Sequence, residues 1–214
     1  MRYSTALFDM DGTLLDTAAD IYDMVNHVLQ KHGFPAVSQE TVVAATGNGA
    51  AMLLAACLPE GKDTPDFDGI LQEYKDYYAA HPGSKTTLYP GVAELLRELQ
   101  MRGVKVAIVS NKPDAAAKTL GVQLFPGVPV LGERAGVPRK PAADMIRTML
   151  KQLGADGADA VYIGDSEVDA QTARNAQLDF IGVAWGFRGR EKLQKAAPEA
   201  AVVDTWKELL EIVG

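Results

Sequence analysis

Short apolar runs separated by helix-like segments constrain the fold of this chain more than any other feature. Each run has the length of a strand and ends at turn residues, which suits a strand buried on both faces. These strand-like runs cover residues 3–8, 104–109, 160–163 and 180–184. The segments between them carry apolar residues at helical spacing, as residues 92–101 do before Gly103. The alternation predicts an α/β fold, with a Rossmann-like three-layer core around a mainly parallel sheet.

Polar residues follow three of these runs within two positions. They are Asp9, Ser110 and Asp165. Ligands of open parallel sheets bind at the carboxyl ends of the strands, near a point where the strand order reverses. We therefore expect these three side chains to converge on one site.

The first two runs are separated by residues 9–103, far more chain than a simple crossover needs. Four helix-like segments, punctuated by glycine and proline, occupy this stretch. They cover residues 20–31, 39–45, 50–58 and 67–80. We expect a small helical domain of residues 17–85, inserted into a core of residues 1–16 and 86–214 and lying over the strand ends.

The net charge and the hydrophobic pattern limit the kinds of partner that this protein can bind. The formal net charge of −7 repels polyanions, so we expect no nucleic-acid partner. Neither a long apolar span nor a signal-peptide pattern is evident, so we expect a cytoplasmic protein without a membrane partner. A small anionic substrate is compatible with this net charge if a metal ion and nearby cationic side chains offset the negative potential of the protein. The sequence leaves monomer and homodimer open.

The segment of residues 8–16 is the most informative for chemistry. Asp9 and Asp11 lie two residues apart where a strand turns through Gly12, so both carboxylates can point at one place. Like charges this close call for a cation or a shared proton between them. One carboxylate can then attack an electrophile while the other transfers a proton. The alternative is a strand followed by an ordinary Asp-Gly turn.

Asp9-Met10-Asp11-Gly12-Thr13 resembles the DxDGT signature of the haloacid dehalogenase (HAD) phosphatases. Three further motifs follow in the order of that family: Ser110-Asn111, Lys140-Pro141 and Gly164-Asp165-Ser166-Glu167-Val168-Asp169. Each of the three is common by itself, but their order and their positions on matching elements are specific. The resemblance extends from about residue 5 to about residue 187.

The resemblance implies a catalytic role for three residues. Asp9 would attack phosphorus and become an aspartyl phosphate. Asp11 would protonate the leaving alcohol and then activate the water that releases phosphate. Lys140 would balance the negative charge of the phosphate and the nucleophile. Departure of an alcohol needs a proton and departure of a halide does not, so Asp11 favours a phosphatase over a dehalogenase.

The resemblance also implies a magnesium site and a phosphate site. Mg²⁺ would be held by Asp9, the main-chain carbonyl of Asp11, Asp165 and Asp169, the last directly or through water. Mg²⁺ prefers hard oxygen ligands, which these residues supply. Ser110 and Asn111 would hydrogen-bond the phosphoryl oxygens, and Thr13 belongs to the same substrate-binding set. Taken singly, each later motif residue also fits an ordinary turn, a helix start or solvated surface.

The helical insertion resembles the α-helical cap of the phosphoglycolate phosphatase-like branch. Residues 46–50 resemble its cap loop, so Gly47 and Asn48 are candidates for substrate contact. The alternative is that the glycines only separate two helices. Arg188 and Lys192 could meet a substrate carboxylate, but we expect both at the solvated surface.

These observations predict a Mg²⁺-dependent phosphatase that acts on small phosphorylated metabolites, with 2-phosphoglycolate as the leading substrate. A pyrophosphatase, a sugar-phosphate phosphatase and a β-phosphoglucomutase-like enzyme are the enzymatic alternatives. An alternative of another class is a non-catalytic protein that binds a phosphometabolite at a retained site.

Overall fold

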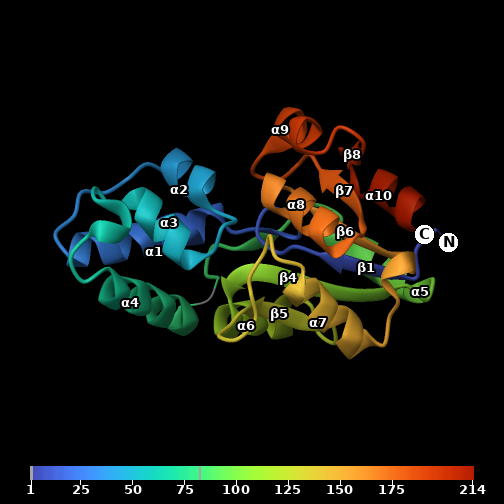
Figure 1. The fold of residues 1–214 in the computed structure, drawn as a ribbon, viewed down its shortest axis with the longest axis horizontal. Helices are drawn as coiled ribbons and strands as arrows, with labels where there is room; N and C mark the ends of the chain where they lie inside the picture. The colour runs from blue at the N-terminus through green and yellow to red at the C-terminus, as the bar shows by residue number, and fades with distance from the viewer. Residues whose placement is uncertain (1, 82) are drawn as a thin grey trace.

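The computed structural model describes residues 2–81 and 83–214. Its main sheet has six parallel strands in the order β5-β4-β1-β6-β7-β8 (Figure 1). These strands are β1 (Thr5–Phe8), β4 (Lys105–Pro113), β5 (Val130–Glu133), β6 (Ala160–Gly164), β7 (Asp179–Val183) and β8 (Ala201–Val203). The predicted α/β fold with a parallel sheet is confirmed.

Helices cover both faces of this sheet, because successive residues of a strand point to opposite sides. In β1, Ala6 and Phe8 belong to one buried cluster and Leu7 to another. The Phe8 cluster includes residues of α5 (Val92–Met101), α6 (Asp114–Leu124) and α10 (Trp206–Val213). The Leu7 cluster includes residues of α7 (Asp144–Leu153) and α8 (Glu167–Ala176). A further helix, α9 (Gly189–Ala196), packs beside α8 and β7.

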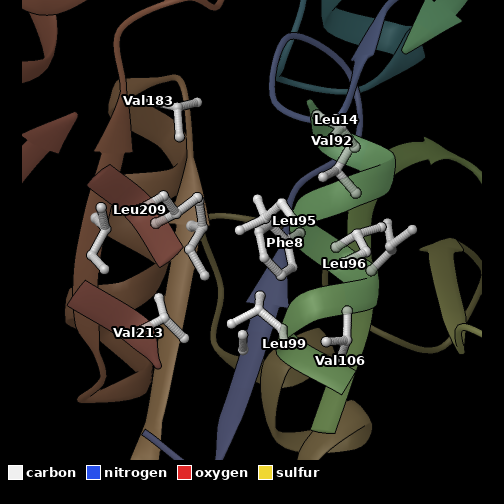
Figure 2. Close-up of a cluster of buried hydrophobic side chains, with 14 of the residues drawn as sticks. Phe8, Leu14, Val92, Leu95, Leu96, Leu99, Val106, Val183, Leu209 and Val213 are labelled. Carbon is white, nitrogen blue, oxygen red and sulfur yellow. The ribbon is translucent and has the colours of Figure 1, made fainter. Parts of the chain in front are cut away.

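Helix α5 shows how the sequence pattern becomes packing. Val92, Leu95, Leu96 and Leu99 recur at helical spacing and are buried, whereas the other face of the helix is charged. Figure 2 shows Phe8 beside Leu95 and Leu99 of α5, with Leu209 and Val213 of α10 across the same cluster. Burial of each such side chain is worth about 1.5–3 kcal/mol. This cluster fixes β1, and therefore the residues that follow it.

Four helices form an insertion between two short strands, β2 (Leu15–Asp16) and β3 (Thr87–Leu88). The helical insertion consists of α1 (Ala18–Lys31), α2 (Gln39–Ala45), α3 (Ala50–Cys57) and α4 (Phe67–Ala80). It lies to one side of the main sheet (Figure 1) and has an apolar cluster of its own. Strands β2 and β3 pair in antiparallel fashion where the chain leaves and rejoins the core. The division at residues 17 and 85 stays a prediction.

Two boundaries differ from the expectation. Strand β4 continues to Pro113, past Val109, because it pairs with β5 again after a shift of register between these two residues. Proline suits the first turn of a helix, which predicts a helix start at Pro141, but α7 begins at Asp144, and the peptide bond between Lys140 and Pro141 is cis. Ser110 and Asn111 are therefore strand residues. Strands β5 and β8, which flank the sheet, were not among the expected strands.

Within residues 2–81 and 83–214, no helix combines the length and the apolar character needed to cross a membrane.

Two glycines with nearly equal backbone angles have different surroundings. Gly91, before α5, has φ +80°, and a Cβ there would lie 2.0 Å from Cδ1 of Trp206. Gly103, after α5, has φ +81°, and a Cβ there would meet nothing within 4 Å. A substitution at Gly103 therefore tests backbone strain alone, whereas the same substitution at Gly91 adds a collision with Trp206 of the neighbouring helix.

We expect Gly91→Ala to destabilise the protein more than Gly103→Ala. The second substitution adds only the strain of a left-handed alanine, about 1–2 kcal/mol. The first must also displace Trp206 from the cluster, which brings the total to about 3 kcal/mol or more. Urea unfolding of both variants measures the difference. Equal losses would show that Trp206 moves aside without cost.

Candidate active site

The order of the central strands brings the sequence-predicted residues together. Strand β1 lies between β4 and β6, so the residues that follow or end these strands meet at one edge of the sheet. Asp9 follows β1, Ser110 and Asn111 lie near the end of β4, and Asp165 follows β6. All four are buried. The expected convergence at the carboxyl ends of the strands is present.

Lys140 connects two of the acidic residues. Its ammonium lies 2.8 Å from Oδ1 of Asp9 and 2.7 Å from Oδ1 of Asp169. It also donates to the hydroxyl of Tyr162, which donates in turn to the carbonyl of Val109. Burial alone would lower the pKa of Lys140, but Asp169 and Asp9 outweigh it and hold this pKa well above its usual range. The side chain therefore stays a cation.

Three carboxylates form a compact cluster. One oxygen each of Asp9, Asp165 and Asp169 lie within 4.8 Å of one another. Burial, opposed by Lys140 and aided by Asp169 and Asp11, raises the pKa of Asp9 to about 7. Burial, followed by Asp169 and Asp9, raises the pKa of Asp165 well above its usual value. Buried oxygen ligands that repel one another in this way fit a hard divalent cation.

The three acids are not equally free to bind a metal. Oδ1 of Asp169 pairs with Lys140, and its Oδ2 accepts hydrogen bonds from the main-chain N–H and the hydroxyl of Ser166. The bond from the main-chain N–H of Ser166 is one half of the capping box at the start of α8, and the other half is the bond from the N–H of Asp169 to the hydroxyl of Ser166. Asp169 has the most protein partners of the three acids, because it accepts from Lys140, from Tyr162 and twice from Ser166. It therefore suits a metal contact through water, and Asp9 and Asp165, which have fewer partners, suit direct contact.

Asp165 is held by the loop that follows β7 and by the turn after β1. Its Oδ2 accepts the main-chain N–H of Phe187 at 2.7 Å, and its Oδ1 accepts the hydroxyl of Thr13 at 3.4 Å. A Cβ at Gly12 would lie 2.4 Å from Oδ2 of Asp165, and Gly12 has φ +82°. The turn in the Asp-Gly-Thr segment therefore needs glycine both for its backbone angle and for space.

The residues expected to bind substrate divide into two groups. Ser110 and Gly47 line a cavity beside Asp9, as does Asn111. The amide of Asn111 is also engaged with protein groups: it bonds the main-chain N–H and carbonyl of Lys140 and donates to the carbonyl of Gly47. Thr13 donates to Asp165, and Asn48 is not among the described residues that line the cavity.

The cavity lies between the core and the helical insertion and has a volume of about 40 Å³. Asp9 and Asp11 line it together with Ser110, Asn111 and Lys112 of β4. The helical insertion contributes Ile21, Thr46, Gly47, Gly49, Ala50, Leu53, Tyr74 and Tyr78. The nucleophile and the proton donor expected from the sequence therefore line the same small cavity.

Sequence reasoning missed Lys112 and Tyr78. Lys112 directly follows the Ser110-Asn111 motif, and its ammonium lies 2.8 Å from Oδ1 of Asp11 and bonds the hydroxyl of Tyr78. Its burial depends on the continuation of β4 past Val109, which the apolar run did not indicate. The only sequence signal was its position beside the motif.

The expectation that Arg188 is solvated surface was wrong. Its side chain is only 5% exposed, because it donates to the carbonyls of Val43, Ala44 and Thr46 at the end of α2. A cation interacts favourably with the carbonyls at the end of a helix, one of which, that of Val43, also accepts the main-chain N–H of Thr46. Lys192 is exposed as expected. Arg188 therefore joins the core to the helical insertion.

We expect Arg188→Ala to loosen this junction. Three carbonyls lose a hydrogen bond from Arg188, so amide hydrogens of α2 and residues 46–49 should exchange at least about ten-fold faster, while those of α10 keep their rate. Hydrogen–deuterium exchange read by mass spectrometry measures this. Arg190→Ala is the control, since Arg190 pairs with Asp204 at the surface. Unchanged exchange in α2 would contradict the role of Arg188.

The carboxylate cluster predicts how stability depends on pH. The pKa of Asp9 is raised from 3.8 to about 7, so the metal-free folded protein retains a proton that the unfolded chain releases. Stability from this group is complete below about pH 4 and is lost as pH rises through about pH 7. Without metal, Tm of the wild type should fall relative to Asp9→Asn across this window.

Mg²⁺ should raise Tm of the wild type more at about pH 8 than at about pH 5, because the ionised cluster binds the cation. Thermal unfolding in EDTA and in Mg²⁺ at both pH values is the measurement. Equal increments at the two pH values would contradict a metal site built on Asp9.

Comparison with known proteins agrees with the geometry. Residues 6–183 match the family described as haloacid dehalogenase-like hydrolase. The chain is 32% identical to a phosphoglycolate phosphatase of Vibrio parahaemolyticus, over 96% of this chain and 94% of that protein. It is 30% identical to an N-acetylmuramic acid 6-phosphate phosphatase of Pseudomonas aeruginosa, over 100% of this chain and 96% of that protein.

A solved structure from Lactobacillus delbrueckii subsp. bulgaricus, described as a candidate phosphoglycolate phosphatase, has a TM-score of 0.91. It is 38% identical to this chain and covers 100% of it, while the match spans 99% of that chain. The agreement extends through the core and the helical insertion. The chain thus belongs to the haloacid dehalogenase-like hydrolase family, within its phosphoglycolate phosphatase-like branch.

Proposed function

We propose that this protein is a Mg²⁺-dependent phosphatase that hydrolyses small-metabolite phosphate monoesters through an aspartyl phosphate, with 2-phosphoglycolate as its preferred substrate. One observation carries the proposal: Asp9 and Asp11 line the same cavity, while the buried ammonium of Lys140 contacts Asp9. A nucleophile, a proton donor and a fixed cation are the groups that phosphoryl transfer requires.

The residues divide the chemistry between two steps. Asp9 attacks phosphorus, and the bond to the alcohol oxygen breaks as Asp11 gives that oxygen a proton. Asp11 then takes a proton from water, which attacks the aspartyl phosphate, releases phosphate and restores Asp9. The cation of Lys140, 2.8 Å from Asp9, offsets the charge that a phosphate dianion brings to a carboxylate.

The carboxylates of Asp9 and Asp165, with Asp169 through water, are the groups that would hold Mg²⁺. When bound, the cation supplies further positive charge to the phosphoryl oxygens. Ser110 lines the cavity and is the residue of β4 whose hydroxyl would hydrogen-bond the phosphoryl group. Asn111 would act through its bonds to Lys140 and Gly47, which keep both in place.

The size of the cavity supports a small substrate. A volume of about 40 Å³ allows only a few water-sized positions. Two-carbon glycolate esters suit this space, whereas most of a sugar as large as N-acetylmuramic acid would extend beyond it. The relatives include phosphatases named for both substrates, at 32% and 30% identity. The small volume of the cavity favours the smaller substrate.

Phosphate release from a panel of compounds tests the proposal. The panel contains 2-phosphoglycolate, N-acetylmuramic acid 6-phosphate, glucose 6-phosphate, β-glucose 1-phosphate and pyrophosphate, each in Mg²⁺ and in EDTA. We expect Mg²⁺-dependent turnover, with kcat/KM highest for 2-phosphoglycolate. Asp9→Asn and Asp11→Asn should each lower kcat by about 1,000-fold or more, since they remove the nucleophile and the proton donor.

Asp68→Asn is the matched control, because Asp68 is an exposed aspartate of α4, and it should keep wild-type rates. Turnover that persists in Asp9→Asn would refute the aspartyl phosphate. Isomerisation of β-glucose 1-phosphate without equivalent phosphate release would support a mutase instead. Tight binding of a phosphometabolite without any turnover in Mg²⁺ would support a non-catalytic binding protein.

A further inference from the structure

Lys112 is a buried cation that the mechanism above does not use. Its side chain is 1% exposed, and its ammonium lies 2.8 Å from Oδ1 of Asp11. The same ammonium bonds the hydroxyl of Tyr78 and lies 4.2 Å from the centroid of that ring. Since Tyr78 belongs to α4, Lys112 connects the proton donor of the core to the helical insertion.

The remaining walls of the cavity define what surrounds this cation. Among the described residues that line the cavity, Lys112 alone carries a positive charge. Ile21, Leu53 and Tyr74 of the helical insertion add hydrocarbon and aromatic surface. Lys140 points instead at Asp9 and Asp169, behind the nucleophile. The part of a substrate beyond its phosphoryl group therefore meets apolar surface and one ammonium.

Tyr78 adds a neutral donor beside that ammonium. Burial, Asp11 and Asp20 raise the pKa of Tyr78 well above its usual value, so the hydroxyl stays protonated. Its oxygen accepts from Lys112, which leaves its own proton to be donated. A buried cation and a hydroxyl donor side by side can pair with a carboxylate and donate a hydrogen bond to it, so together they form a site for an anion.

We propose that Lys112 is the specificity-determining residue of this site and binds the carboxylate of a small substrate whose phosphate ester lies on the carbon next to that carboxylate. This inference rests on the proposed function. Asp11 must reach the ester oxygen to protonate it, and Lys112 is in direct contact with Asp11. A carboxylate one carbon from the ester oxygen is therefore within reach of the ammonium.

An exchange of partners follows from this arrangement. In the structure the ammonium of Lys112 pairs with Asp11. A substrate carboxylate takes over that ammonium, and the Asp11 carboxyl group turns to the leaving oxygen. A neutral substrate has no charge with which to displace Asp11, so it leaves the proton donor held by Lys112. The value of kcat/KM should therefore be higher for an acidic substrate than for a neutral one.

A matched pair of esters tests this in the full-length protein with Mg²⁺. In 2-phosphoglycolate the carbon that bears the ester carries a carboxylate, and in 2-hydroxyethyl phosphate it carries a hydroxymethyl group. We expect the wild type to prefer 2-phosphoglycolate by about 100-fold or more in kcat/KM, since the site pairs a charge that the neutral ester lacks. Lys112→Gln should lower this ratio at least about 30-fold.

The ratio separates specificity from a general effect on Asp11. Loss of support for Asp11 alone would lower both rates alike and leave the ratio unchanged, which would overturn the proposal. Lys118→Gln, which removes a half-exposed lysine paired with Asp114, is the control and should keep the wild-type ratio. Tyr78→Phe keeps the ring and removes the hydroxyl, and it should lower the ratio less than Lys112→Gln does.

Binding without chemistry gives an independent measurement. Isothermal titration of Asp9→Asn with 3-phosphonopropionate and with 3-hydroxypropylphosphonate compares an acid and an alcohol of similar size. The acid should bind at least about ten-fold tighter, and Lys112→Gln in the same background should remove this preference. Equal affinities for the two compounds would overturn the proposal, and Tm of each variant shows whether it is folded.

Failure of this inference differs from failure of the proposed function. Wild-type protein that releases phosphate from neither ester in Mg²⁺, nor from the wider panel, would contradict the phosphatase. Wild-type protein that hydrolyses both esters with equal efficiency would leave the phosphatase standing and remove the role of Lys112.

Discussion

The ammonium of Lys140 lies 2.8 Å from Asp9 and 2.7 Å from Asp169, and all three side chains are buried. Charges removed from water are tolerated only when they are paired at close range and bonded further. Tyr162 and Ser166 complete these bonds, and Asn111 fixes the main chain of Lys140. The position of the nucleophile therefore depends on one cation that joins the end of β1 to the start of α8.

The close approach of these acids is possible because glycine occupies the positions beside them. A Cβ at Gly164 would lie 2.3 Å from the Cβ of Asp169, and one at Gly186 would lie 2.3 Å from the Cβ of Asp165. Any larger residue would separate the carboxylates that the Lys140 cation and a metal must hold together. Gly164 and Gly186 thus affect the electrostatics of the site only because they leave room for the carboxylates to lie close together.

Much of the core and of the acidic site could be predicted, because both follow from local patterns. Apolar runs set the strands, and Asp9 and Asp165 come directly after two of them, so parallel pairing was enough to bring them together. Lys112 and Arg188 could not be placed in this way. Lys112 bonds Tyr78, 34 positions away, and Arg188 bonds Val43, 145 positions away. Their burial comes from contacts between the helical insertion and the core, which no local pattern encodes.

The antiparallel pair of β2 and β3 has a consequence for how such proteins diversify. Leu15 pairs with Leu88 and Asp16 with Thr87, so the chain leaves the core and returns to it at neighbouring points. Recombination or duplication that replaces the segment between these strands leaves both attachment points where they were. A protein lineage can therefore keep the same catalytic centre while it acquires a different inserted domain over it. Its range of substrates can change while the reaction stays the same.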